Sequence, residues 1–256
     1  MFFYLFVSFI LGSAVGSFLN VVIDRTTRGE SIRGRSYCDH CRVTLSTLDL
    51  IPIISFIVFR AKCRYCKKPL SWQYPLIESL TAILFTLAFY ILAKNSNLAI
   101  IPLLYYFLII SVSIIVAVVD LKYYLIPTTF VYIASIIALF YNYLFLSSTL
   151  FVEHVIAGFV IAFLFLLIVL VTRGRGMGQG DIVLVFLMGM VLGYKGTFVA
   201  IFLAFLTGAI VSVALIISRK KHFGQTVPFA PFLILGFLTS LFWSEQLLNI
   251  YLQMLY

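Results

Sequence analysis

Long apolar runs, separated by short polar segments, make up most of this chain. About 20 apolar residues are enough to carry a helix across the hydrocarbon core of a bilayer. We expect helices throughout, because lipid offers no hydrogen-bond partner to an unpaired backbone group. The pattern predicts eight spans, the sixth of them short: Phe2–Ile23, Leu76–Ala93, Leu98–Val119, Thr129–Leu146, Glu153–Val171, Ile182–Tyr194, Thr197–Ile217 and Phe229–Ile250.

Composition agrees with this pattern. Of the 256 residues, 63% are hydrophobic and only 11% are charged, which excludes an ordinary soluble domain. We therefore expect an all-α polytopic membrane protein, in contact with membrane lipid, that is built from three parts. These are a first transmembrane helix over residues 1–23, a small cytoplasmic module over residues 24–75, and a seven-helix membrane domain over residues 76–256.

The distribution of basic residues predicts the orientation. A net charge of +9 can indicate nucleic-acid binding, but sixteen of the eighteen Lys and Arg residues fall on one side of the predicted spans. This bias is typical of cytoplasmic loops, so we expect the N-terminus outside and no nucleic-acid partner. The first 23 residues carry no charge and precede the basic residues, which favours an uncleaved helix over a signal peptide. The inner segments are 24–75, 120–128, 172–181 and 218–228, and the outer connections hold Lys94 and Lys195.

The module of residues 24–75 contains all four cysteines of the chain. Cys38 and Cys41 form one Cys-x-x-Cys pair, and Cys63 and Cys66 form a second. This spacing suits four thiolates around one tetrahedral zinc ion. A module of this size has too small a hydrophobic core to be stable alone, so a bound metal ion is expected to stabilise it. The alternatives are disulfides, which the cytoplasm disfavours, or redox pairs. Four protein ligands leave no open position, so the zinc is expected to be structural, with Asp39 and His40 solvated beside it.

Two acidic residues stand at the edges of apolar runs. Asp120 ends the third predicted span and Asp181 precedes the sixth, both on the predicted cytoplasmic side. A carboxylate at the edge of the hydrocarbon is costly and therefore suggests a function. Two carboxylates that share a site cannot both ionise cheaply, so the pair is expected to hold one proton and to act as acid and base. The alternatives are a helix cap at Asp181 and an ion pair between Asp120 and Lys122.

Glycines precede the second aspartate at alternating positions. Gly176, Gly178 and Gly180 allow close approach of another backbone, so we expect this loop to receive an extended peptide substrate. The spacing matches no phosphate-binding fingerprint, which makes a nucleotide site a poor alternative. Glu78 lies just inside the second predicted span. It is expected either to pair with a basic residue of the cysteine module or to take part in chemistry.

These motifs together resemble the bacterial type IV prepilin peptidases, also called prepilin leader peptidase/N-methyltransferases. The combination is far more specific than the short Gly-x-Gly-Asp motif alone. The likeness runs from about residue 10 to residue 232. In chain order it rests on Gly16-Ser17-Phe18-Leu19-Asn20, Arg25, the two Cys-x-x-Cys pairs, Ile51-Pro52-Ile53-Ile54-Ser55, Tyr74-Pro75-Leu76-Ile77-Glu78, Asp120, Ile126-Pro127 and Gly178-Gln179-Gly180-Asp181.

The resemblance implies an aspartic endopeptidase of the bacterial inner membrane, with Asp120 and Asp181 as its catalytic residues. Such an enzyme removes the leader peptide of type IV prepilins or pseudopilins at the cytoplasmic face. It commonly methylates the new N-terminus with S-adenosylmethionine, and Glu78 matches a glutamate with a possible role in methyl transfer. The resemblance also implies that zinc is bound by Cys38, Cys41, Cys63 and Cys66.

Some positions depart from the family pattern, and two other classes of protein stay open. Asp24 stands where a tyrosine is usual, Thr128 follows Ile126-Pro127 where an aspartate is frequent, and Ala230 replaces a frequent glycine. An ion-coupled membrane transporter also uses intramembrane carboxylates, but it needs no cysteine module and places them nearer the midplane. A zinc-bearing membrane scaffold without catalysis is the third possibility.

Overall fold

The computed structural model describes residues 1–94, 98–174, 177–218 and 227–255. Gly176 and most of the basic segment 218–228 lie outside these ranges. Within them the chain is helical, without a named strand, and seven helices are long and apolar enough to cross a membrane. The elements are α1 (Phe2–Arg28), η1 (Thr47–Leu50), α2 (Ile54–Val58), α3 (Gln73–Lys94), α4 (Ile100–Tyr123), α5 (Thr128–Phe145), α6 (Ser148–Val171), α7 (Gln179–Ile217) and α8 (Ala230–Leu255).

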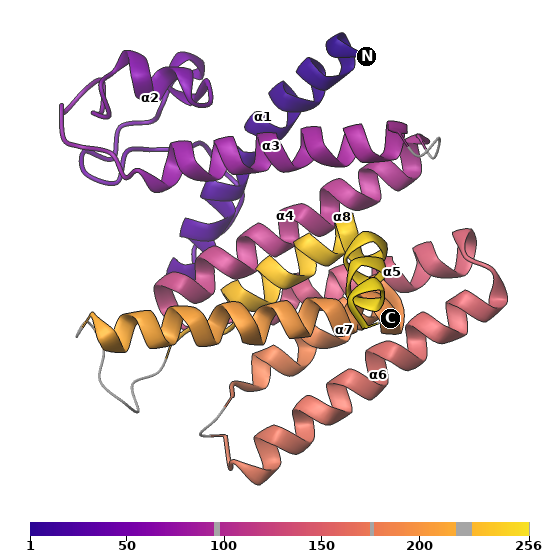
Figure 1. The fold of residues 1–256 in the computed structure, drawn as a ribbon. Coiled ribbons are helices and arrows are strands. Elements are labelled where there is room, and N and C mark those ends of the chain that lie inside the picture. The colour runs from indigo at the N-terminus through magenta and orange to yellow at the C-terminus, as the bar shows by residue number, and fades with distance from the viewer. Residues whose placement is uncertain (95–97, 175–176, 219–226, 256) are drawn as a thin grey trace. The chain divides into compact units, whose positions relative to one another are not determined.

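Contacts divide the chain into two compact units, Met1–Ile115 and Val116–Tyr256. In the first unit, α1 packs along α3 (Figure 1). The small residues of α1 allow this close approach, since a Cβ at Gly12 would lie 2.6 Å from the Cα of Ala82. A Cβ at Gly16 would lie 2.7 Å from the Cα of Glu78. The Gly-x-x-x-Gly spacing of the first span is thus a helix-packing motif, as is common in membranes.

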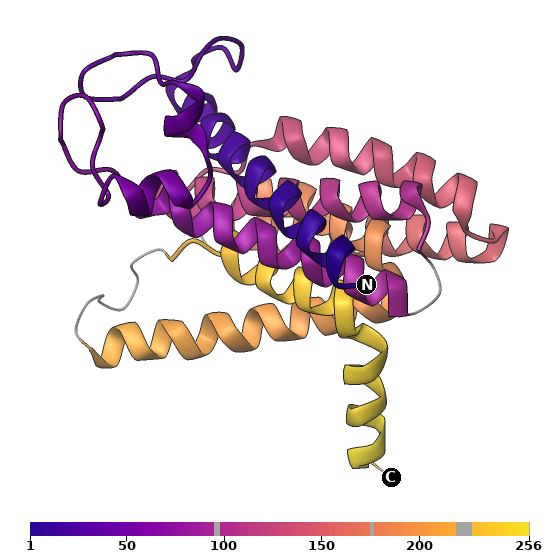
Figure 2. The same ribbon diagram turned by 90° about the horizontal axis from the view of Figure 1, so that it is seen from above.

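The cysteine module follows α1 and consists of loops with the short elements η1 and α2 (Figure 2). Arg25 holds the beginning of these loops. Its buried guanidinium donates hydrogen bonds to the carbonyls of Ser31, Ile32, Arg33 and Arg35, at 2.8–3.2 Å. A planar guanidinium with five N–H donors can satisfy several carbonyls at once. One side chain of the first membrane helix therefore fixes the entry into the module.

The second unit contains α5 to α8, with α7 packed against α5, α6 and α8. The helix α7 is bent at Gly193, whose φ of 65° and ψ of −173° are not helical, and its two arms diverge from this point (Figure 1). The bend frees the carbonyl of Met190, which accepts instead from Nδ2 of Asn142 at 2.6 Å and contacts Nδ1 of His154 at 3.0 Å. Buried carbonyls require such partners.

The bend accounts for the difference between eight predicted spans and seven helices. The predicted sixth and seventh spans, Ile182–Tyr194 and Thr197–Ile217, are the two arms of α7. Gly193 is the residue with non-helical φ and ψ at which the two arms meet. The prediction of an all-α polytopic membrane fold is confirmed, and the sequence break falls next to the residue at which the helix bends.

Candidate active site and metal centre

Asp120 lies near the end of α4 and is buried, with 6% of its surface exposed. Its Oδ2 accepts a hydrogen bond from the backbone N–H of Ala230, the first residue of α8, at 3.2 Å. The first N–H groups of a helix have no partner inside that helix. The carboxylate therefore occupies the N-terminal end of α8, where the helix dipole favours a negative charge.

Asp181 is the third residue of α7 and is equally buried. Its Oδ2 accepts the N–H of Gly178, the residue that precedes the helix, at 3.1 Å. The N-cap residue is Gly178, and Asp181, at the third helical position, bonds back to it. Asp181 is thus not itself the N-cap residue that the alternative interpretation of the sequence suggested. It also lies close enough to Asp120 to interact with the charge of that residue. Asp181 therefore bonds the backbone of Gly178 and also interacts with the buried carboxylate of Asp120.

The glycines before Asp181 have different local surroundings. Gly178 has an extended backbone (φ −76°, ψ 151°), and a Cβ there would meet only Oδ2 of Asp181, at 3.5 Å. Gly180 leaves no space, because its Cβ would lie 2.8 Å from the Cβ of Ile126. Gly176 lies outside the described residues. Open space beside Asp181 therefore occurs at Gly178, whereas Gly180 serves the packing of α7 against the Ile126-Pro127 segment.

An apolar hollow of about 290 Å³ adjoins these residues. Met177, on one wall, directly precedes the residue that donates to Asp181. Phe229, on another wall, directly precedes the residue that donates to Asp120. Gly208 of α7 contributes to the lining without a side chain. Apolar side chains and Ser212 line the hollow, and neither aspartate does, but two of its lining residues directly precede the residues that bond the aspartates.

The four cysteines of the module come together as one cluster. Their sulfur atoms all lie within 4.8 Å of one another, so Cys38, Cys41, Cys63 and Cys66 can hold a metal ion. The two Cys-x-x-Cys pairs have the same local structure. In each, the N–H of the first cysteine donates to a carbonyl five residues later, and the residue four positions later has a positive φ (Arg42 and Lys67).

One sulfur–sulfur distance in the cluster is close to that of a tetrahedral zinc site. Zinc–sulfur bonds of about 2.3 Å in a tetrahedron place sulfur atoms about 3.8 Å apart. The sulfur atoms of Cys38 and Cys66, one from each pair, are 3.9 Å apart. Cys38 and Cys63 are buried, while Cys41 and Cys66 are half-buried. Four soft thiol donors are therefore close enough together to hold one metal ion.

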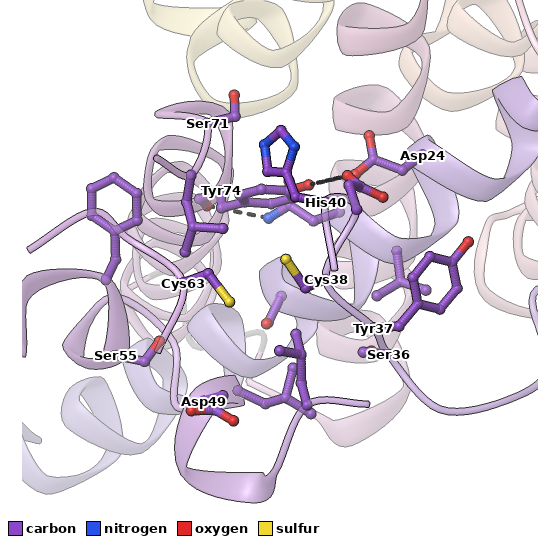
Figure 3. Close-up of a pocket in the computed structure, with 18 of the residues that line it drawn as sticks. Asp24, Ser36, Tyr37, Cys38, His40, Asp49, Ser55, Cys63, Ser71 and Tyr74 are labelled. Carbon is purple, nitrogen blue, oxygen red and sulfur yellow. Dashed lines mark hydrogen bonds between the residues drawn. The ribbon is translucent and has the colours of Figure 1, made fainter. Parts of the chain in front are cut away.

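Asp39 is not simply solvated, as the sequence suggested for it. Arg28 of α1 donates to its Oδ1 at 2.6 Å and holds the pKa of this carboxyl below its usual range. The hydroxyl of Tyr74 in α3 lies 3.4 Å from Oδ2 of Asp39 and 3.1 Å from Oδ2 of Asp24 (Figure 3). These residues connect α1, α3 and the first Cys-x-x-Cys pair. These residues lie far apart in the sequence, so no local sequence pattern predicted the contacts between them.

Glu78 is buried in α3, and its partner is a backbone group. Its Oε2 accepts the N–H of Ile53 at 2.7 Å, and the Ser17 hydroxyl also bonds this carboxylate. Ile53 has a φ of 62°, which is strained for a β-branched residue. The expected pairing with a basic residue of the module is thus replaced by a hydrogen bond that holds a strained turn.

Comparison with known proteins identifies the family. Residues 10–92 match the model of the bacterial peptidase A24 N-terminal domain, and residues 107–213 match that of the type IV leader peptidase family. A prepilin leader peptidase/N-methyltransferase of Bacillus subtilis (strain 168) is 32% identical, over 96% of this chain and 97% of the relative. The chain belongs to the type IV leader peptidase family.

Other members of the family support this assignment. A prepilin leader peptidase/N-methyltransferase of Aeromonas hydrophila is 29% identical, over 95% of this chain and 92% of the relative. One of Myxococcus xanthus (strain DK1622) is 50% identical over 78 residues, which make up 30% of this chain and 23% of that protein. No solved structure matches the chain. The family assignment leaves the transporter interpretation without support.

Proposed function

We propose that this family member removes the leader peptide of type IV prepilins or pseudopilins and that Asp120 and Asp181 carry out the hydrolysis. One observation carries the proposal. Two buried carboxylates, 61 positions apart in sequence, interact electrostatically, and each is bonded to a backbone N–H beside the same apolar hollow. Burial favours the sharing of one proton between such groups, which gives one acid and one base.

The two carboxylates supply the proton transfers of peptide hydrolysis. The ionised aspartate takes a proton from water as the water oxygen bonds to the carbonyl carbon of the scissile peptide. The protonated aspartate gives its hydrogen to the amide nitrogen, which leaves with the electron pair of the broken C–N bond. One water is consumed, and the products are a new carboxyl group and a new amino group. The proton remains within the pair for the next cycle.

The surroundings of the pair fit a peptide whose apolar part is embedded in a membrane. Gly178 offers an extended backbone without a side chain beside Asp181. An extended peptide can lie against such a segment, because no Cβ keeps the two backbones apart. The apolar hollow bounded by Met177 and Phe229 then receives an apolar side chain of the substrate next to the scissile bond.

The orientation that suits this substrate places both aspartates at the cytoplasmic face of the bacterial inner membrane. Asp120 lies near the end of one apolar helix and Asp181 near the start of another. Sixteen of eighteen Lys and Arg residues lie in the segments assigned to the same side. This bias supports a cytoplasmic location for the aspartates and for the cysteine module, with the N-terminus outside.

The chain also methylates the new N-terminus, in keeping with the name of its relatives. S-adenosylmethionine, when bound, supplies a methyl group carried on a sulfonium sulfur. Glu78 stays a candidate for this step, although its bonds to Ile53 and Ser17 favour a positioning role. Cys38, Cys41, Cys63 and Cys66 would hold a zinc ion in the module. With four thiolate ligands the ion would support the structure of the module and would not take part in the reaction.

The test is mass spectrometry of the N-terminus of a prepilin co-expressed with the full chain. Asp120→Asn and Asp181→Asn should each abolish leader removal, and both proteins should remain in the membrane at normal levels. Cleavage at the normal rate by either variant would remove that residue from the mechanism. A synthetic substrate that already lacks its leader should still be methylated by Asp181→Asn, since that reaction needs no hydrolysis.

A further inference from the structure

The cysteine module exposes an apolar surface at the short helix α2. Phe56 of this helix is buried and holds it against the rest of the module. Ile54, Ile57 and Val58 are exposed, Ile57 to 68% of its surface. Large apolar side chains that gather on a surface in this way indicate a contact with a partner or with a membrane.

Trp72 joins this surface to a membrane helix. Its side chain is 73% exposed and directly precedes α3, one of the helices long and apolar enough to cross a membrane. The rings of Trp72 and Phe56 meet edge to face, with centroids 5.0 Å apart, so α2 lies beside the start of α3 (Figure 1). The 22 residues of α3 span about 33 Å, close to the thickness of the hydrocarbon core. Trp72 and α2 therefore lie at the level where this core ends.

The exposed apolar surface continues along α3. The N–H of Leu76 donates to the carbonyl of Trp72 at 3.3 Å, so Trp72 extends the first turn of the helix. Leu76, Leu80 and Ile83 are exposed, and each lies three or four positions after the previous residue of the series. Residues at this spacing share one face of a helix. The surface of α2 and Trp72 thus leads into an exposed apolar face of α3.

The same part of the module carries charge of one sign. Between Asp49 and Glu78 the sequence contains no acidic residue. It contains five basic residues there, all of them exposed: Arg60, Lys62, Arg64, Lys67 and Lys68. Residues 24–49, in contrast, hold five arginines and four acidic residues. The positive charge of the module is therefore concentrated in the half that contains α2.

Backbone hydrogen bonds keep these cations next to α2. The N–H of Ala61 donates to the carbonyl of Phe56, and the N–H of Leu70 donates to the carbonyl of Ala61, each at 2.8 Å. The second Cys-x-x-Cys pair lies in the loop between Ala61 and Leu70. This loop, residues 62–69, therefore begins and ends at the C-terminal end of α2, and it carries four of the five cations.

A bilayer that contains anionic phospholipid fits both parts of this surface. Cations attract the headgroups, while neighbouring apolar side chains enter the boundary between headgroups and acyl chains. A second copy of this chain fits less well, because it would bring the same five cations. We propose that α2, Trp72 and the loop of residues 62–69 bind anionic phospholipid and hold the cysteine module on the membrane. This binding is independent of the proposed peptide hydrolysis.

The first test measures the depth of α2 by tryptophan fluorescence of the full chain in lipid nanodiscs, in which both membrane faces are accessible. Trp72→Phe and Trp243→Phe remove the two natural tryptophans, and Ile57→Trp then introduces a single indole on α2. Lipids brominated on their acyl chains should quench its fluorescence, and the neutral aqueous quencher acrylamide should quench it only weakly. Quenching by acrylamide alone would show that α2 faces water. Quenching by neither would show that protein covers it, and either result would overturn the proposal.

The second test asks whether the cations select anionic lipid. Brominated phosphatidylglycerol should quench the indole at position 57 about twofold more than the same fraction of brominated phosphatidylcholine, and high salt should reduce this difference. Lys67→Gln with Lys68→Gln should abolish the difference. Arg33→Gln with Arg35→Gln removes two exposed cations from the other half of the module and should preserve it.

Zinc content and leader cleavage should be normal in both double variants, which excludes unfolding. Equal quenching by the two lipids before any lysine is replaced would overturn the proposal. An equal loss of the difference in both double variants would do so as well, since it would show that net charge acts and not this surface.

Discussion

The backbone N–H of Ala230 donates a hydrogen bond to Oδ2 of Asp120, across 110 positions of sequence. This bond joins the start of α8 to the end of α4 within the second unit. Ala230 is fully buried, so water does not replace the carboxylate as its acceptor. Asp120 thus has a structural role that is separate from the proposed proton transfer.

Asp120→Ala should therefore destabilise the protein, whereas Asp120→Asn should not. Alanine leaves the Ala230 N–H buried without an acceptor, which costs about 1–3 kcal/mol. The amide oxygen of asparagine can still accept this bond. Thermal unfolding in detergent should give a lower midpoint for the alanine variant alone, although both variants lose leader cleavage. Equal midpoints for the two variants would show that the bond contributes little.

Gly180 and Gly178 should respond differently to alanine. At Gly180 the new Cβ would overlap Ile126, and relief of this overlap would shift Asp181, the next residue of α7. Overpacking of this kind costs about 1–3 kcal/mol, and misplacement of a reacting group slows the reaction. At Gly178 the backbone already has a φ that any residue adopts.

The comparison is made by cleavage kinetics and thermal unfolding of the two single variants. Gly180→Ala should lower both kcat and the unfolding midpoint. Gly178→Ala should keep the midpoint, and any loss should appear in KM, because the new methyl group lies where the substrate backbone is expected. A normal kcat for Gly180→Ala would show that the start of α7 adjusts without moving Asp181.

The sequence predicted those site residues whose chemistry is visible within a short stretch of the chain. Asp120 and Asp181 were identified because ionisable residues are rare beside apolar runs, and the cysteines because zinc ligands recur at fixed spacing. The clustering of the four sulfur atoms agrees with the second expectation. The catalytic role of the two aspartates stays a prediction. Each of these features has a chemical reason that a short stretch of sequence already displays.

The contacts around these residues could not be predicted in the same way. Glu78 bonds Ile53 and Tyr74 bonds Asp24, pairs that lie 25 and 50 positions apart. Neither pair follows a helical or strand period, because each depends on how a loop returns to a helix. The sequence predicted a break between the sixth and seventh spans, next to Gly193, but it could not show that the two helical segments meet there in a bend. A glycine with positive φ has no sequence signature that distinguishes it from a packing glycine.

The apolar hollow beside the aspartates can be filled from α7. A side chain at Gly208 would begin in ordinary contact with Phe232 and Phe229, at 3.6–3.7 Å, and would extend into the hollow. Gly208→Leu should raise KM for prepilin roughly tenfold, since an apolar pocket supplies about 1–3 kcal/mol of recognition. Ile210→Leu, at an exposed position of the same helix, is the matched control. An unchanged KM for Gly208→Leu would mean that the substrate does not enter the hollow.

Loss of one thiolate should empty the metal site. Cys38→Ser should lower bound zinc from one ion per chain to near zero, because the remaining three ligands no longer close the tetrahedron. Residues 29–72 should then become sensitive to proteases, since metal binding and folding of such small modules are coupled. His40→Ala changes a residue between Cys38 and Cys41 that is not a proposed ligand, and it should retain zinc. Metal analysis that finds a full complement in Cys38→Ser would refute the four-cysteine site.

Substitutions at Glu78 separate its positioning role from a chemical one. Glutamine keeps an acceptor oxygen for the Ile53 N–H, whereas alanine leaves this donor unsatisfied and releases the strained turn. Because the bond to Ile53 accounts for the position of Glu78, Glu78→Gln should retain methyl transfer to a pre-cleaved substrate within about threefold, and Glu78→Ala should lose most of it. Methylation assays, with leader cleavage as the internal control, decide between the roles. If glutamine abolishes methylation while cleavage and zinc content stay normal, the negative charge of Glu78 acts in the reaction itself.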